Sequence, residues 1–240
     1  MGAPEITVIV PTYLEAENLP VLVPRIVRAL KSARREGEIL VVDDDSPDNT
    51  EEVCADLATL FPIRLLVRRG ERGLAGAVLH AIERSEGEIV AVMDADLSHP
   101  PEKLGELLAA LDEKGVDFAL GSRYVEGGST EAGWGLDRLI NSRVATLLAG
   151  PLTRVSDPMT GFFALRRSTY QRASVLDPLG FKIALELMVK CRCRKVVEIP
   201  IHFGQRLRGE SKLSFRERFD YLRHLARLYR FKLMSKTREA

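Results

Sequence analysis

Two aspartates, separated by one residue, follow a short apolar segment near the middle of this 240-residue chain. The apolar segment, residues 88–93, is rich in β-branched residues and favours a central strand of a parallel sheet. Open α/β sheets bind their ligands beyond the carboxyl ends of such strands. Asp94 and Asp96, which flank Ala95, are therefore predicted to hold a divalent cation and a diphosphate.

Strand-like and helix-like segments alternate along the first half of the chain. Strands are predicted at residues 6–10, 38–42, 63–67, 88–93 and 117–121, and helices at 19–31, 50–60, 74–83 and 101–111. This alternation predicts an α/β fold with a mostly parallel central sheet flanked by helices. After Val125 the pattern is less regular, with a helix predicted near 136–149 and strands at 162–166 and 196–199.

The bulk composition excludes several classes of protein. A hydrophobic content of 45% and a charged content of 29% are those of an ordinary globular protein, and the net charge of +1 gives no reason to expect a nucleic-acid partner. Three cysteines argue against a disulfide framework and against structural zinc, and favour a reducing cytosol. The first residues do not resemble a signal peptide, and no apolar run approaches the roughly 18 residues of a membrane span, so any membrane association is expected to be peripheral.

A second group of acids follows the second predicted strand. Asp43, Asp44 and Asp45 are expected at the same edge of the sheet as Asp94 and Asp96. Carboxylates there can bind a base or a ribose, or hold a hard cation that bridges phosphate oxygens. For Asp48 and for one of the three consecutive acids, a helix cap or a solvated turn is the preferred explanation.

The turn after the first strand is not a dinucleotide-binding turn. Residues 11–15 contain no glycine, which disfavours an NAD-dependent oxidoreductase. Gly70, Gly73 and Gly76 come later, after the third strand, and indicate either a close approach of the backbone to a ligand or a simple turn.

The last segment has the pattern of an amphipathic helix over residues 215–234. One face is apolar and arginines surround it. This pattern fits an interfacial helix on a membrane and a surface helix docked on the domain equally well. The apolar face is predicted to contain Phe215, Phe219, Leu222, Leu225 or Ala226, Tyr229 and Leu233.

Five segments are informative through their order and spacing: residues 8–18, 41–48, 93–101, 121–124 and 206–212. Together they resemble the family 2 glycosyltransferases with a GT-A fold, and within them the dolichyl-phosphate or polyprenyl-phosphate mannose synthases. The resemblance implies a GT-A catalytic domain over residues 1–212, and the residue pattern predicts a C-terminal amphipathic helix, suited to a membrane surface, over residues 213–240.

The resemblance also implies roles for individual residues. It assigns nucleotide binding to Pro11, Tyr13, Glu15, Asp43, Asp44, Asp94, Ala95, Arg206 and Lys212. It assigns Mg²⁺ or Mn²⁺ to Asp94, Asp96 and Ser98, and the acceptor's phosphate to Arg123, Arg138 and Ser142. Asp96, Arg123 and Arg206 are the expected catalytic residues, and Asp157 is expected to orient sugar hydroxyls or a loop. Leu14 and Ser98 stand where the family usually has Asn and often has Gln.

The implied reaction is an inverting transfer of mannose from GDP-mannose to a polyprenyl or dolichyl phosphate on the cytosolic face of a membrane. Some members of the family use a small membrane-anchoring subunit as a partner. Three alternatives remain open from the sequence. The first is a family 2 transferase that uses UDP-glucose or another nucleotide sugar with a lipid-phosphate or saccharide acceptor. The others are a non-catalytic nucleotide-sugar-binding or membrane-recruiting subunit and a nucleotidyltransferase. The last should have a glycine-rich basic loop after the first strand, which residues 11–15 do not provide.

Overall fold

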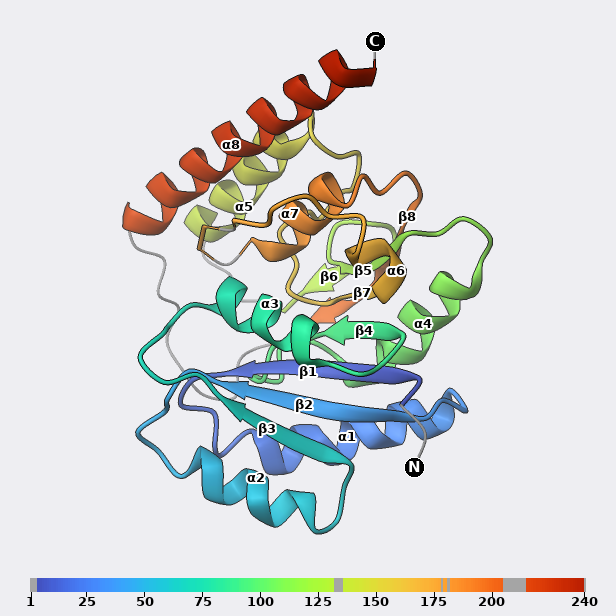
Figure 1. Cartoon of the computed structure of the whole chain (residues 1–240), viewed down its shortest axis with the longest axis vertical. Coiled ribbons are helices and arrows are strands. Elements are labelled where there is room, and N and C mark those ends of the chain that lie inside the picture. Colours follow the sequence, from blue (N-terminus) through green and yellow to red (C-terminus); the bar gives the residue numbers. More distant parts are fainter. Residues whose placement is uncertain (1–3, 132–135, 178, 181, 205–214, 240) are drawn as a thin grey trace.

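The computed structural model describes residues 4–131, 136–177, 179–180, 182–204 and 215–239 (Figure 1). In two helices that border the omitted segments, the side chains of residues 136–142, 215–218 and 235–239 are also outside the description. Within the described residues, the chain forms a central sheet with helices on both faces and a further pair of helices at one end (Figure 1).

The central sheet has seven strands in the order β3-β2-β1-β4-β7-β5-β8. All neighbours are parallel except β7, which runs antiparallel to both β4 and β5. The predicted α/β fold with a mostly parallel sheet is confirmed. The strands are β1 (Ile6–Thr12), β2 (Gly37–Asp43), β3 (Ile63–Val67), β4 (Ile89–Val92), β5 (Phe118–Ser122), β7 (Phe163–Arg166) and β8 (Val196–Pro200).

The strand register brings the predicted site segments to one edge. Thr12 at the end of β1 lies opposite Asp43 at the end of β2, and Val92 at the end of β4 lies opposite Ile9 of β1. Because these strands are parallel, the residues that follow them emerge on the same side. The turn after β1 and both acidic segments therefore share the carboxyl edge of the sheet.

Helices cover the two faces of the sheet with separate apolar cores. α1 (Leu19–Ser32), α2 (Thr50–Ala58) and α4 (Leu104–Asp112) contribute to one core, and α3 (Leu74–Arg84) and α7 (Ile183–Lys190) contribute to the other. The predicted helices of the first half are confirmed, with the fourth divided into η1 (Pro101–Lys103) and α4. The short α6 (Arg167–Tyr170) and α7 were not predicted.

A third apolar cluster joins α5 (Leu136–Ala149) and α8 (Phe215–Glu239) to α7. The hydroxyl groups of Tyr221 and Tyr229 donate hydrogen bonds of 2.6 Å to the carbonyl oxygens of Ala145 and Leu148, so α8 lies along α5 (Figure 1). The helix docks on the domain through Leu225 and Leu228, whereas Phe219, Leu222 and Leu233 of the predicted apolar face stay exposed. No helix among the described residues has the length and apolar content to cross a membrane.

Candidate active site

The loop after β4 holds Asp96 in a fixed position. Its Oδ1 atom accepts hydrogen bonds from the Ser98 backbone N–H at 3.0 Å and from the Ser98 hydroxyl at 2.5 Å. Leu97, between them, has a φ of 64°, which gives the loop a sharp turn. Ser98 thus orients Asp96, while its predicted contact with a cation stays a prediction.

Asp94, two residues earlier, is fixed through its backbone and is more open to solvent. Its N–H donates to Nδ1 of the buried His99 at 3.2 Å. The His99 ring packs against Phe162 and Phe203, with centroid distances of 5.4 and 5.2 Å. The Asp94 side chain is 27% exposed, which leaves the carboxylate accessible at the edge of the sheet.

The carboxylates of this loop suit a hard cation whose other ligands come from a substrate. Among the described residues, no group of three or more histidine, cysteine or acidic side chains could enclose a metal by itself. Magnesium sites commonly use one or two carboxylates together with phosphate oxygens and water. Asp94 and Asp96 fit that pattern.

Asp43, predicted to contact a nucleotide, is fully buried and shapes its own turn. Its Oδ1 atom accepts hydrogen bonds from the hydroxyl groups of Ser46 at 2.6 Å and Thr12 at 3.1 Å. Its Oδ2 atom accepts one from the Ser46 N–H at 2.8 Å. Asp43 therefore stabilises the loop that carries Asp44 and Asp45.

Asp44 forms a buried ion pair with Arg68, a residue that the sequence analysis missed. Nη1 of Arg68 donates to Asp44 Oδ1 at 2.6 Å, and the Gly73 N–H donates to Oδ2 at 2.7 Å. Burial raises the pKa of Asp44 above its ordinary value, and these donors only partly oppose that effect. A Cβ atom at Gly76 would lie 2.9 Å from Arg68 Nη2. Gly73 and Gly76, two of the three glycines that suggested a close approach to a ligand, thus accommodate this ion pair, for which the sequence held no other signal.

The turn after β1 lies beside the Asp44 ion pair. Pro11 is in the last part of β1, and the guanidinium carbon of Arg72 lies 4.6 Å from the centre of the Tyr13 ring. Leu14 has a φ of 65°, and its N–H donates to the Ser46 hydroxyl at 3.0 Å. Glu15 accepts a side-chain hydrogen bond from Asn18 at 2.5 Å. The structure therefore brings the turn after β1 and the turn after β2 into direct contact.

Arg123, at the end of β5, is held by Asp157. Nε and Nη2 of Arg123 each donate to one oxygen of that carboxylate at 2.7 Å, and the Arg123 N–H adds a bond of 3.1 Å. Burial would lower the pKa of Arg123, but Asp157 outweighs it and holds that pKa above the ordinary value. Glu198 of β8 in turn accepts hydrogen bonds from the backbone N–H groups of Ser156 and Asp157, at 2.7 and 3.2 Å. Asp157 therefore positions Arg123.

The family model described as Glycosyl transferase family 2 matches residues 7–173, which include the acids at the ends of β2 and β4 and the strand before Arg123. The chain belongs to glycosyl transferase family 2.

Three curated relatives of this family 2 transferase carry the name dolichol-phosphate mannosyltransferase. They come from Pyrococcus furiosus, Mycosarcoma maydis and Saccharomyces cerevisiae, and are 44%, 41% and 39% identical to it over 95%, 96% and 95% of its length. The transferase spans 64% of the archaeal relative, 81% of the first fungal one and 88% of the second.

Solved structures agree with the fold of the transferase. The glucosyl-3-phosphoglycerate synthase of Mycobacterium tuberculosis with phosphoglyceric acid superposes with a TM-score of 0.68. The match has 18% identity and covers 93% of this chain and 80% of that one. A complex of the same synthase with Mn²⁺, UDP and glucosyl-3-phosphoglycerate gives a TM-score of 0.63 at 17% identity, over 94% and 78% of the two chains.

Other predicted site residues of the transferase lie outside the description. Arg206 and Lys212 lie outside the described residues, and for Arg138 and Ser142 only the backbone, in α5, is described. The segment before residue 205 is tied to the loop after β4, because the Gly204 N–H donates to the Ser98 carbonyl oxygen at 3.0 Å. Gly204 follows β9 (His202–Phe203), which pairs with β6 (Ser129–Thr130).

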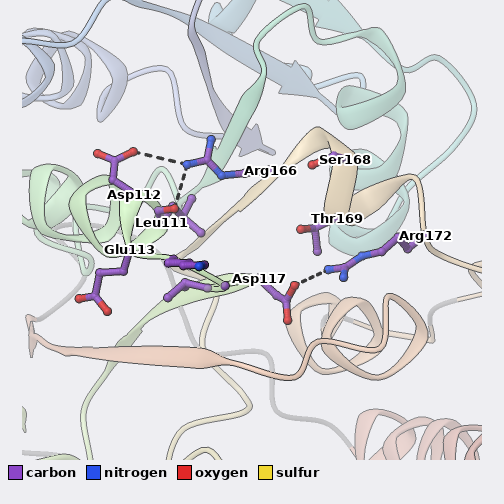
Figure 2. Close-up of a pocket in the computed structure, with 11 residues that line it drawn as sticks. Leu111, Asp112, Glu113, Asp117, Arg166, Ser168, Thr169 and Arg172 are labelled. Atoms are coloured by element: carbon purple, nitrogen blue, oxygen red, sulfur yellow. Dashed lines mark hydrogen bonds and ion pairs between the residues drawn. The ribbon is translucent and has the colours of Figure 1, made fainter.

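A cavity of about 440 Å³ lies away from these acids, near the start of β5 and the end of β7 (Figure 2). Its arginines are already paired: Arg166 with Asp112 at 3.5 Å and Arg172 with Asp117 at 2.7 Å (Figure 2). The carboxyl edge, where the acids lie next to conformationally fixed loops, is therefore the better candidate for the active site.

Proposed function

We propose that this family 2 transferase transfers mannose from GDP-mannose to a polyprenyl or dolichyl phosphate, with inversion at the anomeric carbon. The observation that carries the proposal is the identity of 39–44%, over at least 95% of the chain, with three proteins that share the name dolichol-phosphate mannosyltransferase. The products would be the lipid-phosphate mannose and GDP.

The donor's diphosphate is assigned to the edge that carries Asp94 and Asp96. These two side chains would hold Mg²⁺ or Mn²⁺, and such a cation neutralises the charge that develops on a diphosphate leaving group. The complex of the Mycobacterium synthase with Mn²⁺ and UDP supports a divalent cation in this fold. Arg206 and Lys212 are proposed as additional donors to the diphosphate.

The nucleoside of the donor is assigned to the neighbouring turns. Pro11 comes from the last part of β1, Tyr13 and Glu15 come from the turn after it, and Asp44 comes from the turn after β2. The Ser46 hydroxyl accepts a hydrogen bond from the Leu14 N–H, and the Asp48 carboxylate accepts one from the Ala16 N–H at 3.3 Å. The two turns therefore form one continuous surface. Because this surface is preformed, little conformational entropy is lost when the nucleotide binds.

The acceptor needs no general base. A phosphate monoester has a second pKa of about 6 and is largely dianionic at neutral pH, so its oxygen can attack the anomeric carbon directly. The engagement of both Asp157 oxygens with Arg123 supports this mechanism. Arg123, Arg138 and Ser142 would orient the nucleophile, and catalysis would depend mainly on proximity and electrostatics.

Membrane docking on the cytosolic face is proposed from the α5–α8 pair. Leu147 of α5 and Phe219 and Leu222 of α8 are exposed, and the exposed Arg223 and Arg230 lie on the same helix as the latter two. Apolar residues next to cations favour the surface of an anionic bilayer. This association would bring a membrane-embedded acceptor to the transferase. A small membrane-anchoring subunit is a further proposed partner.

A transfer assay tests the proposal. Purified protein is incubated with radiolabelled GDP-mannose or UDP-glucose, Mg²⁺ or Mn²⁺, and a polyprenyl phosphate, and the label in the organic phase is counted. Label from GDP-mannose alone supports the proposal. Label from UDP-glucose alone would show that the donor is UDP-glucose and not GDP-mannose. Absence of label with either donor, from a protein that binds GDP, favours a non-catalytic subunit. Asp96→Asn is the matched inactive control, because it keeps the size of the side chain.

A further inference from the structure

The ring of Tyr124 contacts two guanidinium groups. The guanidinium carbon of Arg143 lies 4.2 Å from the ring centre, and that of Arg123 lies 5.1 Å from it. Tyr124 follows β5 and Arg143 belongs to α5, so the ring joins the carboxyl edge of the sheet to the helix that carries Arg138 and Ser142. The sequence motifs assign no role to Tyr124 or Arg143.

The two arginines differ in how their charge is compensated. Arg123 is tied to the buried Asp157 by two hydrogen bonds of 2.7 Å, and Asp94 also acts on it electrostatically. The charge of Arg123 is therefore already offset by carboxylates of the protein. Arg143 is exposed and makes no ion pair with any described residue. It supplies positive charge that the described structure leaves uncompensated.

A phosphate dianion needs more positive charge than the Arg123–Asp157 pair provides. Guanidinium groups match phosphate oxygens through paired hydrogen bonds, and the ring restricts the orientation of Arg143 through a cation–π contact. These features point to an anion beside Tyr124.

We propose that Arg143, oriented by Tyr124, is a further binding residue for the phosphate monoester of the acceptor. The inference rests on the proposed function, since it deepens the acceptor site of that reaction. In this arrangement Asp157 fixes the geometry of Arg123, Tyr124 supports both guanidinium groups, and Arg143 contributes the attraction for the dianion. The shared chemistry is that of a phosphate, whether free or esterified to a prenyl chain.

The test is calorimetric binding of geranyl phosphate, inorganic phosphate, geraniol and GDP to the full chain. Because a charge-assisted hydrogen bond is lost, Arg143→Gln should lower the affinity for geranyl phosphate by about tenfold or more. The affinity for GDP should stay within about twofold of the wild-type value. Arg28→Gln, which removes an exposed arginine on α1, should bind geranyl phosphate like the wild type. Tyr124→Leu should behave like Arg143→Gln, and Tyr124→Phe, which keeps the ring, should not.

The ligands separate the possible sources of the anion. Competition by inorganic phosphate together with weak binding of geraniol supports phosphate recognition, whereas equal binding of geraniol and geranyl phosphate overturns it. Unchanged geranyl phosphate binding by Arg143→Gln overturns the proposal, and so does a loss confined to GDP, because the arginine would then serve the donor. Binding does not require turnover. Absence of transfer by the wild type would count against the proposed function alone.

Discussion

The backbone of Gly161 lies directly against the carboxylate of Asp94. A Cβ atom at Gly161 would be 2.9 Å from Oδ1 and 3.1 Å from Oδ2. Gly161→Ala should therefore displace the Asp94 side chain, because no ordinary Cβ contact is that short. We expect the affinity for Mn²⁺ in the presence of GDP to fall roughly 10- to 100-fold, the range seen when the orientation of a metal ligand is lost. Titration by electron paramagnetic resonance measures it.

Gly105→Ala is the matched control for this substitution. Gly105 is in α4, and a Cβ atom there would meet only the Ala33 methyl group, at 3.2 Å. We expect unchanged Mn²⁺ affinity for this variant. If Gly161→Ala bound Mn²⁺ as tightly as the wild type, Asp94 would not be the metal ligand.

The buried pair of Arg123 and Asp157 should contribute strongly to stability. Asp157→Asn removes the negative charge and leaves Arg123 buried with only part of its hydrogen bonding. We expect a loss of about 3 kcal/mol in the free energy of unfolding, since breaking a buried pair leaves an uncompensated charge. Urea denaturation measures it. Glu102→Gln, which breaks the exposed pair with Arg25, should cost less than about 1 kcal/mol. Equal losses in the two variants would contradict this view of Asp157.

Glu186 of α7 should make the docking of α8 sensitive to acid. It is fully buried, and it accepts hydrogen bonds of 2.7 Å from His224 of α8, from Lys190 and from the Asp177 N–H. Desolvation would raise the pKa of Glu186, but these donors outweigh it and hold the pKa below the ordinary 4.5. A carboxylate of this kind stabilises the fold above pH 4.5, and its contribution is lost as the pH falls through the lowered pKa.

Glu186→Gln tests this dependence. The variant should be less stable than the wild type at pH 7, by about 3 kcal/mol, because a buried charged network is broken. The difference should shrink as the pH falls below 4.5 and through the lowered pKa, because the carboxylate of the folded wild type then becomes protonated as well. Urea unfolding between pH 3 and about pH 7 measures it. A difference that stayed constant over that range would contradict a role for the ionised carboxylate.

The sequence predicted the first half of the fold because its signals are local. Apolar runs such as residues 88–93 and the helical periodicity of residues 19–31 depend only on near neighbours, and β4 and α1 are confirmed there. The antiparallel direction of β7 could not be predicted, because an isolated strand pattern does not reveal its partners. Its neighbours, β4 and β5, are far from it in the sequence.

At the site, the sequence identified the residues that follow strand ends, but it did not identify the residues with which they pair. Asp94 and Asp96 were identified by their position after an apolar strand. Arg68, by contrast, pairs with Asp44 across 24 residues, and Asp157 pairs with Arg123 across 34. Such long-range pairs depend on the register of the sheet and on loop paths. No local pattern encodes them.

Leu14 should carry backbone strain that asparagine would relieve. Its φ of 65° lies in the left-handed region, where asparagine is tolerated better than leucine, and its side chain is exposed. Leu14→Asn should raise the free energy of unfolding by about 1 kcal/mol. Leu14→Ala, which keeps a side chain that disfavours this region, should change it little. Thermal denaturation measures both variants, and equal stability of the two would show that strain at this position is negligible.

The exposed apolar residues of α8 should bind a membrane without contributing to the fold. Leu222 is 53% exposed, so Leu222→Ser should change stability by less than about 0.5 kcal/mol. Transfer of a leucine from water to an apolar phase is worth about 1.5–3 kcal/mol, so binding to anionic liposomes should weaken roughly tenfold. Leu225, three residues further along, is buried, so Leu225→Ser should instead lower the free energy of unfolding. Leu147→Ser on α5 should add to the loss of binding if both helices face the bilayer. Liposome sedimentation that Leu222→Ser left unchanged would place the membrane contact elsewhere.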